Sequence, residues 1–71
     1  MTDVVDSDEL LRRIQRGRAW AVREESAWRQ RGAEAAEPDR AREAAARALA
    51  FQAVIGVLDE ILNPGKHAEG G

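Results

Sequence analysis

The strongest constraint on the fold is the regular spacing of apolar residues in the second half of the chain. They recur at alternating steps of three and four, the seam pattern of a coiled-coil helix, at Ala41, Ala44, Ala48, Phe51, Ile55, Leu58 and Leu62. Pro38 suits the first turn of such a helix, because its φ is already helical and no N–H is needed there. Pro64 disfavours helical backbone angles at Asn63. The pattern therefore predicts a helix over residues 38–62.

A second periodic segment occupies the first half of the chain. Asp6 can cap its N-terminus, with Glu9 three residues later in the capping-box position. Ser7 is an alternative cap. At about 100° per residue, small and apolar side chains then form one narrow stripe, with two further apolar residues beside it. The stripe holds Leu10, Ile14, Gly17, Ala21 and Trp28, and its neighbours are Leu11 and Val22.

The end of this first helix lies near a glycine. Gly32 is a candidate for the residue just beyond the helix, where glycine tolerates left-handed backbone angles. The tract Ala33–Glu37 could extend either helix by a turn. We expect a polar lead-in over 1–6, a helical hairpin over 7–62 with helices near 7–31 and 38–62, and a disordered tail over 63–71.

The fold class that these segments predict is all-α, an antiparallel two-helix hairpin with a short linker. Residue sizes agree with this pairing, because a large side chain near the turn would meet small ones. We expect Trp28 to lie over Ala41, Ala44 and Ala45. At the open end, Leu10 and Ile14 should face the branched aliphatic residues Ile55, Leu58 and Leu62.

The hairpin leaves several large apolar residues unused. The chain has 14 alanines and few larger apolar residues, so a two-helix core has almost no net stability. Five residues fall outside the stripe that one partner helix can cover: Trp20, Leu49, Val54, Val57 and Ile61. Exposed apolar surface marks interfaces. We expect self-association, as a homodimer in a four-helix bundle, or docking on a partner protein through an apolar face of the second helix.

An arginine-rich segment indicates a second candidate surface. Seven arginines lie between positions 12 and 31. Four share the side opposite the apolar stripe, as in a phosphate-binding helix: Arg12, Arg13, Arg16 and Arg23. The other interpretation is a solvated face, because acids precede several arginines by four positions, in Asp8–Arg12, Glu9–Arg13, Glu25–Arg29 and Glu43–Arg47. Ten arginines beside one lysine and many alanines also suggest a GC-rich bacterial or phage genome. With a net charge of −2, we favour the solvated face.

No motif for catalysis, cofactor binding or metal binding is present in the sequence. It has no cysteine, no phosphate-binding glycine loop and no HExxH, and its one histidine, His67, has no second ligand near it. Adjacent carboxylates such as Glu24 and Glu25 point about 100° apart on a helix, so they do not converge on one substrate atom. Glu25 lies at the edge of the apolar stripe, where we expect a rim salt bridge to Arg18.

These observations define one expected function and one alternative. No apolar run approaches the roughly 20 residues of a membrane span, and we expect a cytoplasmic protein without membrane contact. We expect a small non-catalytic interaction module, an accessory, adaptor or regulatory protein, with no cofactor and no small-molecule substrate. The alternative is a small dimeric nucleic-acid-associated protein that uses the arginine face.

Overall fold

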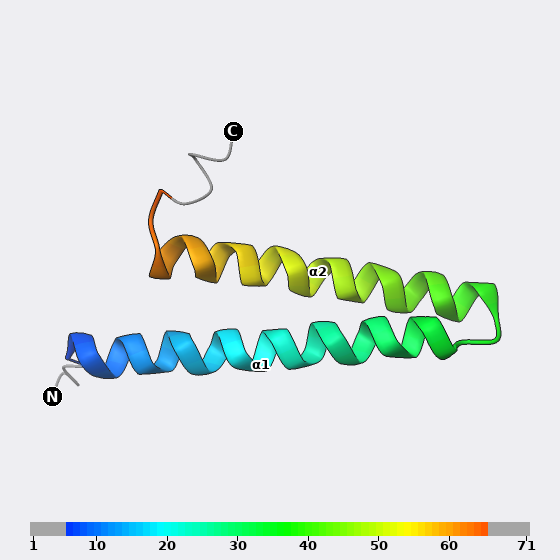
Figure 1. Cartoon of the computed structure of the whole chain (residues 1–71), viewed down its shortest axis with the longest axis horizontal. Helices are drawn as coiled ribbons and strands as arrows, with labels where there is room; N and C mark the ends of the chain where they lie inside the picture. Colours follow the sequence, from blue (N-terminus) through cyan, green and yellow to red (C-terminus); the bar gives the residue numbers. More distant parts are fainter. Residues whose placement is uncertain (1–5, 66–71) are drawn as a thin grey trace, which may run out of the picture.

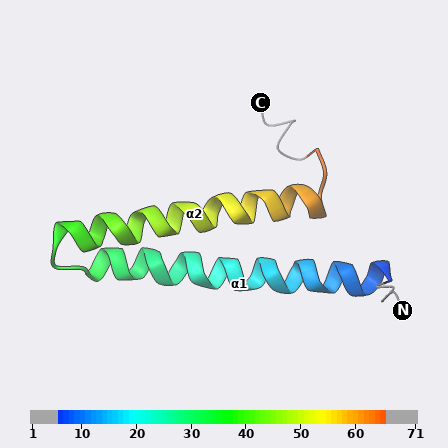
Figure 2. The ribbon, with the colours of Figure 1, turned by 180° about the vertical axis from the view of Figure 1, so that it is seen from behind.

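The computed structural model describes residues 6–65, which form two helices, α1 (Ser7–Glu34) and α2 (Pro38–Leu62). The helices run antiparallel and side by side (Figures 1 and 2). Ala35–Glu37 joins them in a tight connection. No strand occurs between residues 6 and 65. The all-α hairpin predicted from the two periodic segments is confirmed.

Helix α1 begins at the predicted cap. Asp6 has an extended backbone, and its carboxylate accepts a hydrogen bond from the Glu9 backbone N–H at 2.7 Å. This bond satisfies one of the N–H groups that a helix leaves unpaired in its first turn. Asp6 is therefore the cap, and Ser7 is the first residue of the helix. The Glu9 carboxylate accepts hydrogen bonds from the arginines Arg12 and Arg13.

Helix α1 continues to Glu34, beyond its predicted end, and Gly32 lies inside it. The prediction that Gly32 follows the helix was wrong. A Cβ atom at position 32 would lie 3.4 Å from the Cβ of Ala44 and 3.7 Å from the carbonyl oxygen of Ala41. These are ordinary van der Waals distances, so Gly32 lies directly against α2 at the turn. The chain leaves α1 at Ala35, which has an extended backbone.

Helix α2 has the predicted range, and a turn follows it. Gly65 has a φ of 88°, which favours glycine, and its N–H donates a hydrogen bond to the Glu60 carboxylate at 2.9 Å. Residues 63–65 are thus arranged as a turn, in contrast to the predicted disorder. The rest of the predicted tail, residues 66–71 with His67, lies outside the described residues, as do residues 1–5.

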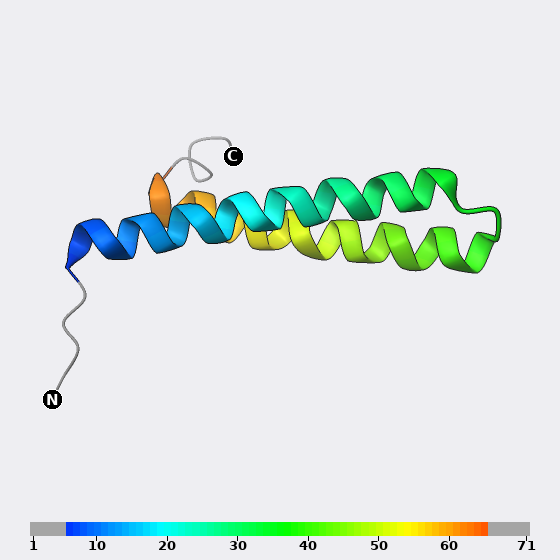
Figure 3. The same ribbon diagram turned by 90° about the horizontal axis from the view of Figure 1, so that it is seen from below.

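The core between the helices is built from small side chains. Within residues 6–65, the buried apolar residues are Ala21, Ala44 and Ala48. Ile14 and the facing residues Ile55, Leu58 and Leu62 are only half-buried. The ribbons lie close at the turn and draw apart toward the open end (Figure 1), and they cross at a shallow angle in Figure 3. Leu10 is 52% exposed, more than its predicted contacts implied, because the helices separate there.

Candidate interaction surface

One side of the seam between α1 and α2 is polar. Arg18 Nε donates a hydrogen bond to Asp59 Oδ1 at 2.6 Å, and Gln52 Nε2 donates one to Glu25 Oε2 at 3.0 Å. Both bonds join α1 to α2. The bond to Asp59, together with the charge of that carboxylate, raises the pKa of the Arg18 guanidinium above its ordinary value. We call these four residues the polar side.

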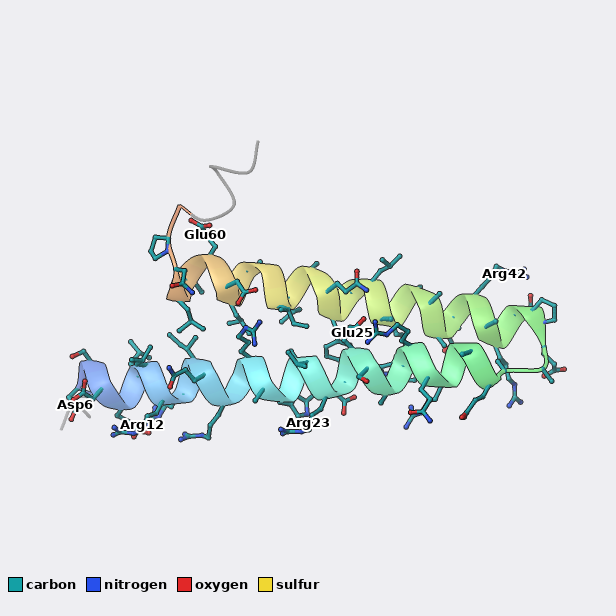
Figure 4. All side chains as sticks on the ribbon, in the orientation of Figure 1. Asp6, Arg12, Arg23, Glu25, Arg42 and Glu60 are labelled. Atoms are coloured by element: carbon teal, nitrogen blue, oxygen red, sulfur yellow. The ribbon has the colours of Figure 1, made fainter. Side chains whose placement is uncertain are left out.

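Glu25 is the one polar residue buried within the described part of the chain, at 8% exposure. It points toward α2 (Figure 4), where it binds Gln52, and its other oxygen lies 3.3 Å from Arg29 Nη2. The predicted rim salt bridge between Glu25 and Arg18 was wrong. Arg18 lies two turns nearer the open end than Glu25 and pairs with Asp59 instead.

The other side of the seam is apolar. Trp20 packs edge-on against Phe51, with ring centroids 5.3 Å apart and ring planes at 75°. Steps of three and four residues from Phe51 lead along the same flank of α2 to Val54, Leu58 and Ile61. Val57 lies one turn from Ile61, on the outer edge of this flank. We call the set the apolar face; it comprises Trp20, Phe51, Val54, Val57, Leu58 and Ile61.

The predicted interface residues are all exposed, but they do not form a single surface. The apolar face holds Trp20 (51% exposed), Val54 (43%), Val57 (60%) and Ile61 (52%). Leu49 is 63% exposed but lies about 140° around α2 from Val54. It lines a hollow that Gln52 of the polar side shares with Trp28 and several alanines. Sequence reasoning assigned Phe51 and Leu58 to the internal seam alone, whereas each is half-buried and open on this face.

Trp28 lies near the turn and is half-buried. As predicted, it lies beside small residues of α2, because it shares two surface hollows with Ala41, Ala44 and Ala45. The guanidinium carbons of Arg31 and Arg47 lie 4.5 and 4.8 Å from its ring centroid. Such cation–π contacts are favourable. Trp28 therefore anchors the turn end of the hairpin and is not part of the apolar face.

The arginine face proposed as the alternative is partly neutralised. Arg12 and Arg13 each lie 3.0 Å from a Glu9 carboxylate oxygen, and Arg16 lies 3.7 Å away. The hydrogen bond from Arg13, followed by that from Arg12, lowers the pKa of Glu9. Arg23 lies further along α1, and both it and Arg12 point away from α2 (Figure 4).

The predicted helix ion pairs are mostly as expected. Glu9–Arg13, Glu25–Arg29 and Glu43–Arg47 are confirmed, with N–O distances of 3.0, 3.3 and 3.0 Å. Arg12 pairs with Glu9, three residues before it, and not with the predicted Asp8. The arginines are thus largely matched by acids on their own helix, the arrangement of a solvated face.

Comparisons with known proteins give no family for this chain, since it matches no protein-family model, no curated protein and no solved structure. Residues 6–65 contain no cluster of three acidic, histidine or cysteine side chains that could hold a metal ion. Neither of their two helices is both long enough and apolar enough to span a membrane.

Proposed function

We propose that this protein is a non-catalytic interaction module that binds another protein chain through the apolar face. One observation carries the proposal. The buried apolar residues of the described hairpin are all alanines, whereas Trp20, Val54, Val57 and Ile61 are each at least 43% exposed. The larger apolar side chains therefore lie mainly outside the hairpin's own core.

This distribution is unfavourable for an isolated hairpin. Burial of apolar surface stabilises a fold by about 25 cal/mol per Å², and the hairpin forgoes about half of this gain at the exposed residues of the apolar face. Ordering each residue costs about 1.5 kcal/mol. A chain that covers the apolar face would recover the missing burial, so binding and folding should be mutually reinforcing.

The arginine face supports the nucleic-acid alternative less well. Three of its four arginines share the single carboxylate of Glu9, and each such pairing must weaken before a phosphate can take its place. The whole chain also carries a net charge of −2. Phosphate binding normally draws on a strong local excess of positive charge.

Site-specific photo-cross-linking in the source cells tests the proposal. A photoreactive side chain at Val57 should give a cross-linked protein adduct, because Val57 lies on the apolar face. The same side chain at Leu49 is the matched control, since Leu49 is equally exposed on the same helix but faces the polar side. Arg12→Glu with Arg16→Glu should leave the Val57 adduct unchanged. No protein adduct at Val57, or a nucleic-acid adduct that depends on the arginines, would contradict the proposal.

A further inference from the structure

We infer that the chain that covers the apolar face is a second copy of this protein, with α2 packed antiparallel against α2 of the other copy. This inference rests on the proposed function and names its partner. The two hairpins would form a four-helix bundle in which the α2 helices are central and the α1 helices lie outside. Trp20 would flank the central pair from α1.

The sizes of the side chains on the outer stripe of α2 favour an antiparallel pair. At steps of four, four, three and four, this stripe holds Ala46, Ala50, Val54, Val57 and Ile61. It therefore changes from small to large along the helix. An antiparallel pair centred between residues 53 and 54 places Ala50 of one copy opposite Val57 of the other, and Ala46 opposite Ile61. A parallel pair would place alanine opposite alanine and leave a gap, which close-packed interfaces avoid.

The charges along α2 favour the same orientation. The first part of the helix, residues 38–47, carries three arginines and two acids, a net of +1. The second part, residues 48–62, carries two acids and no basic residue, a net of −2. Ion pairs offset most of these charges: Glu37, Asp39 and Glu43 pair with the three arginines, and Arg18 of α1 pairs with Asp59, which leaves Glu60. A parallel pair would bring the two copies of Glu60 to the same level, whereas an antiparallel pair separates these like charges.

The outer stripe can also be buried without burying an unpaired charge. Its five residues are uncharged. Of the acids beside it, Glu43 continues the line of the stripe but is paired with Arg47 at 3.0 Å, and Asp59 is bonded to Arg18 at 2.6 Å. Burial of an unpaired charge is the largest penalty that an interface of this kind could carry. The stripe avoids it along its whole length.

Light scattering of the purified full chain tests self-association. We expect a dimer, and we expect Val54→Glu with Ile61→Glu to give a monomer because it places two charges per copy in the interface. Leu49→Glu introduces the same chemistry on the same helix but on the polar side, so this control should remain a dimer. A wild-type chain that stays monomeric at all concentrations, or a Leu49→Glu variant that dissociates as fully as the double variant, would overturn the inference.

Cysteine cross-linking tests the orientation without a destabilising charge. The natural chain has no cysteine, so Ala50→Cys and Val57→Cys each introduce a single thiol. With residue 50 opposite residue 57, an antiparallel pair separates the two copies of residue 50 by about 10 Å along the axis, beyond the roughly 4.4–6.8 Å that a disulfide spans. We therefore expect a covalent dimer from an equal mixture of the two variants and little from either alone.

The outcomes separate this inference from the proposed function. Efficient disulfide formation by Ala50→Cys alone would indicate a parallel pair and would overturn the antiparallel arrangement. A monomeric wild-type chain whose Val57 photo-adduct contains a different protein would overturn the second-copy inference and leave the proposed function intact. A Val57 position that cross-links to no protein would reject the proposed function itself.

Discussion

The two tryptophans of α1 have different surroundings, and their substitutions should have different effects. Trp28 is half-buried among alanines and two guanidinium groups, so Trp28→Ala should destabilise the hairpin by about 2–3 kcal/mol, below the full cost for a buried tryptophan. Trp20 is 51% exposed. Trp20→Ala should therefore destabilise the hairpin less than Trp28→Ala does, and it should weaken partner binding more. Thermal unfolding followed by circular dichroism, with light scattering, measures both. A larger stability loss for Trp20 would contradict the assignment of these side chains.

The three arginines beside Glu9 make a contribution to the free energy of unfolding that depends on pH. Because they lower the pKa of Glu9 in the folded state, the contribution is present above the ordinary glutamate range. It is lost as the pH falls through that lowered pKa. We expect the pKa of Glu9 in an NMR titration to rise toward its ordinary value in Arg13→Gln, whose side chain cannot form the ion pair. An unchanged pKa in this variant would show that Arg13 is not its main cause.

Alanine substitutions at the two glycines of α1, Gly17 and Gly32, test whether both positions are helical. Glycine inside a helix costs about 1 kcal/mol relative to alanine. Gly17→Ala should recover this cost, because nothing lies within 4 Å of a Cβ there. Gly32→Ala should recover part of it, since the new Cβ would make a 3.4 Å contact with Ala44. If Gly32 instead ended the helix with left-handed angles, alanine would lower the melting temperature.

Between the helices, the Arg18–Asp59 pair should be worth more than the pairs within one helix. It is partly buried, with side-chain exposures of 39% and 22%, whereas the surface pair Arg47–Glu43 is 53% and 60% exposed. A double-mutant cycle with Arg18→Ala and Asp59→Asn should give a coupling of up to about 1 kcal/mol. The same cycle at Arg47 and Glu43 should give roughly 0.3–0.5 kcal/mol. Equal coupling energies for the two pairs would mean that the Arg18–Asp59 ion pair contributes no more stability than an ion pair on the surface of one helix.

The sequence predicts the elements better than it predicts the seam between them. Apolar spacing and the Asp6 and Pro38 signals suffice for both helices, because each depends on local chemistry. The position of Glu25 at the edge of the apolar stripe predicts a rim salt bridge to Arg18, yet Gln52 on the other helix supplies a partner for a buried carboxylate. No local pattern reveals such a pair. Leu49 was grouped with the interface residues because spacing gives its angle on α2 but not the chemistry of the side it faces.

At the scale of the whole molecule, the hairpin is elongated for its length. Its radius of gyration is 15.9 Å, against about 11 Å for a compact chain of this size and roughly 14–15 Å for one twice as long. Side-by-side pairing of two hairpins should therefore double the mass and leave the radius of gyration close to that of one hairpin. Small-angle X-ray scattering with light scattering measures both quantities. An end-to-end dimer would instead raise the radius of gyration strongly.

The alanine core also determines how α1 is aligned lengthwise with α2. Methyl groups project little from a helix, so a translation of one helix by a turn would change the apolar contact at Ala21, Ala44 and Ala48 only slightly. These three methyl groups alone cannot select one alignment. The hydrogen bonds of Glu25 and Arg18, at two different levels along the helices, the ring contact of Trp20 with Phe51 and the short connection at Ala35–Glu37 select it. The lengthwise position of the helices in this hairpin is thus encoded by directional contacts outside the buried core and by the length of its loop.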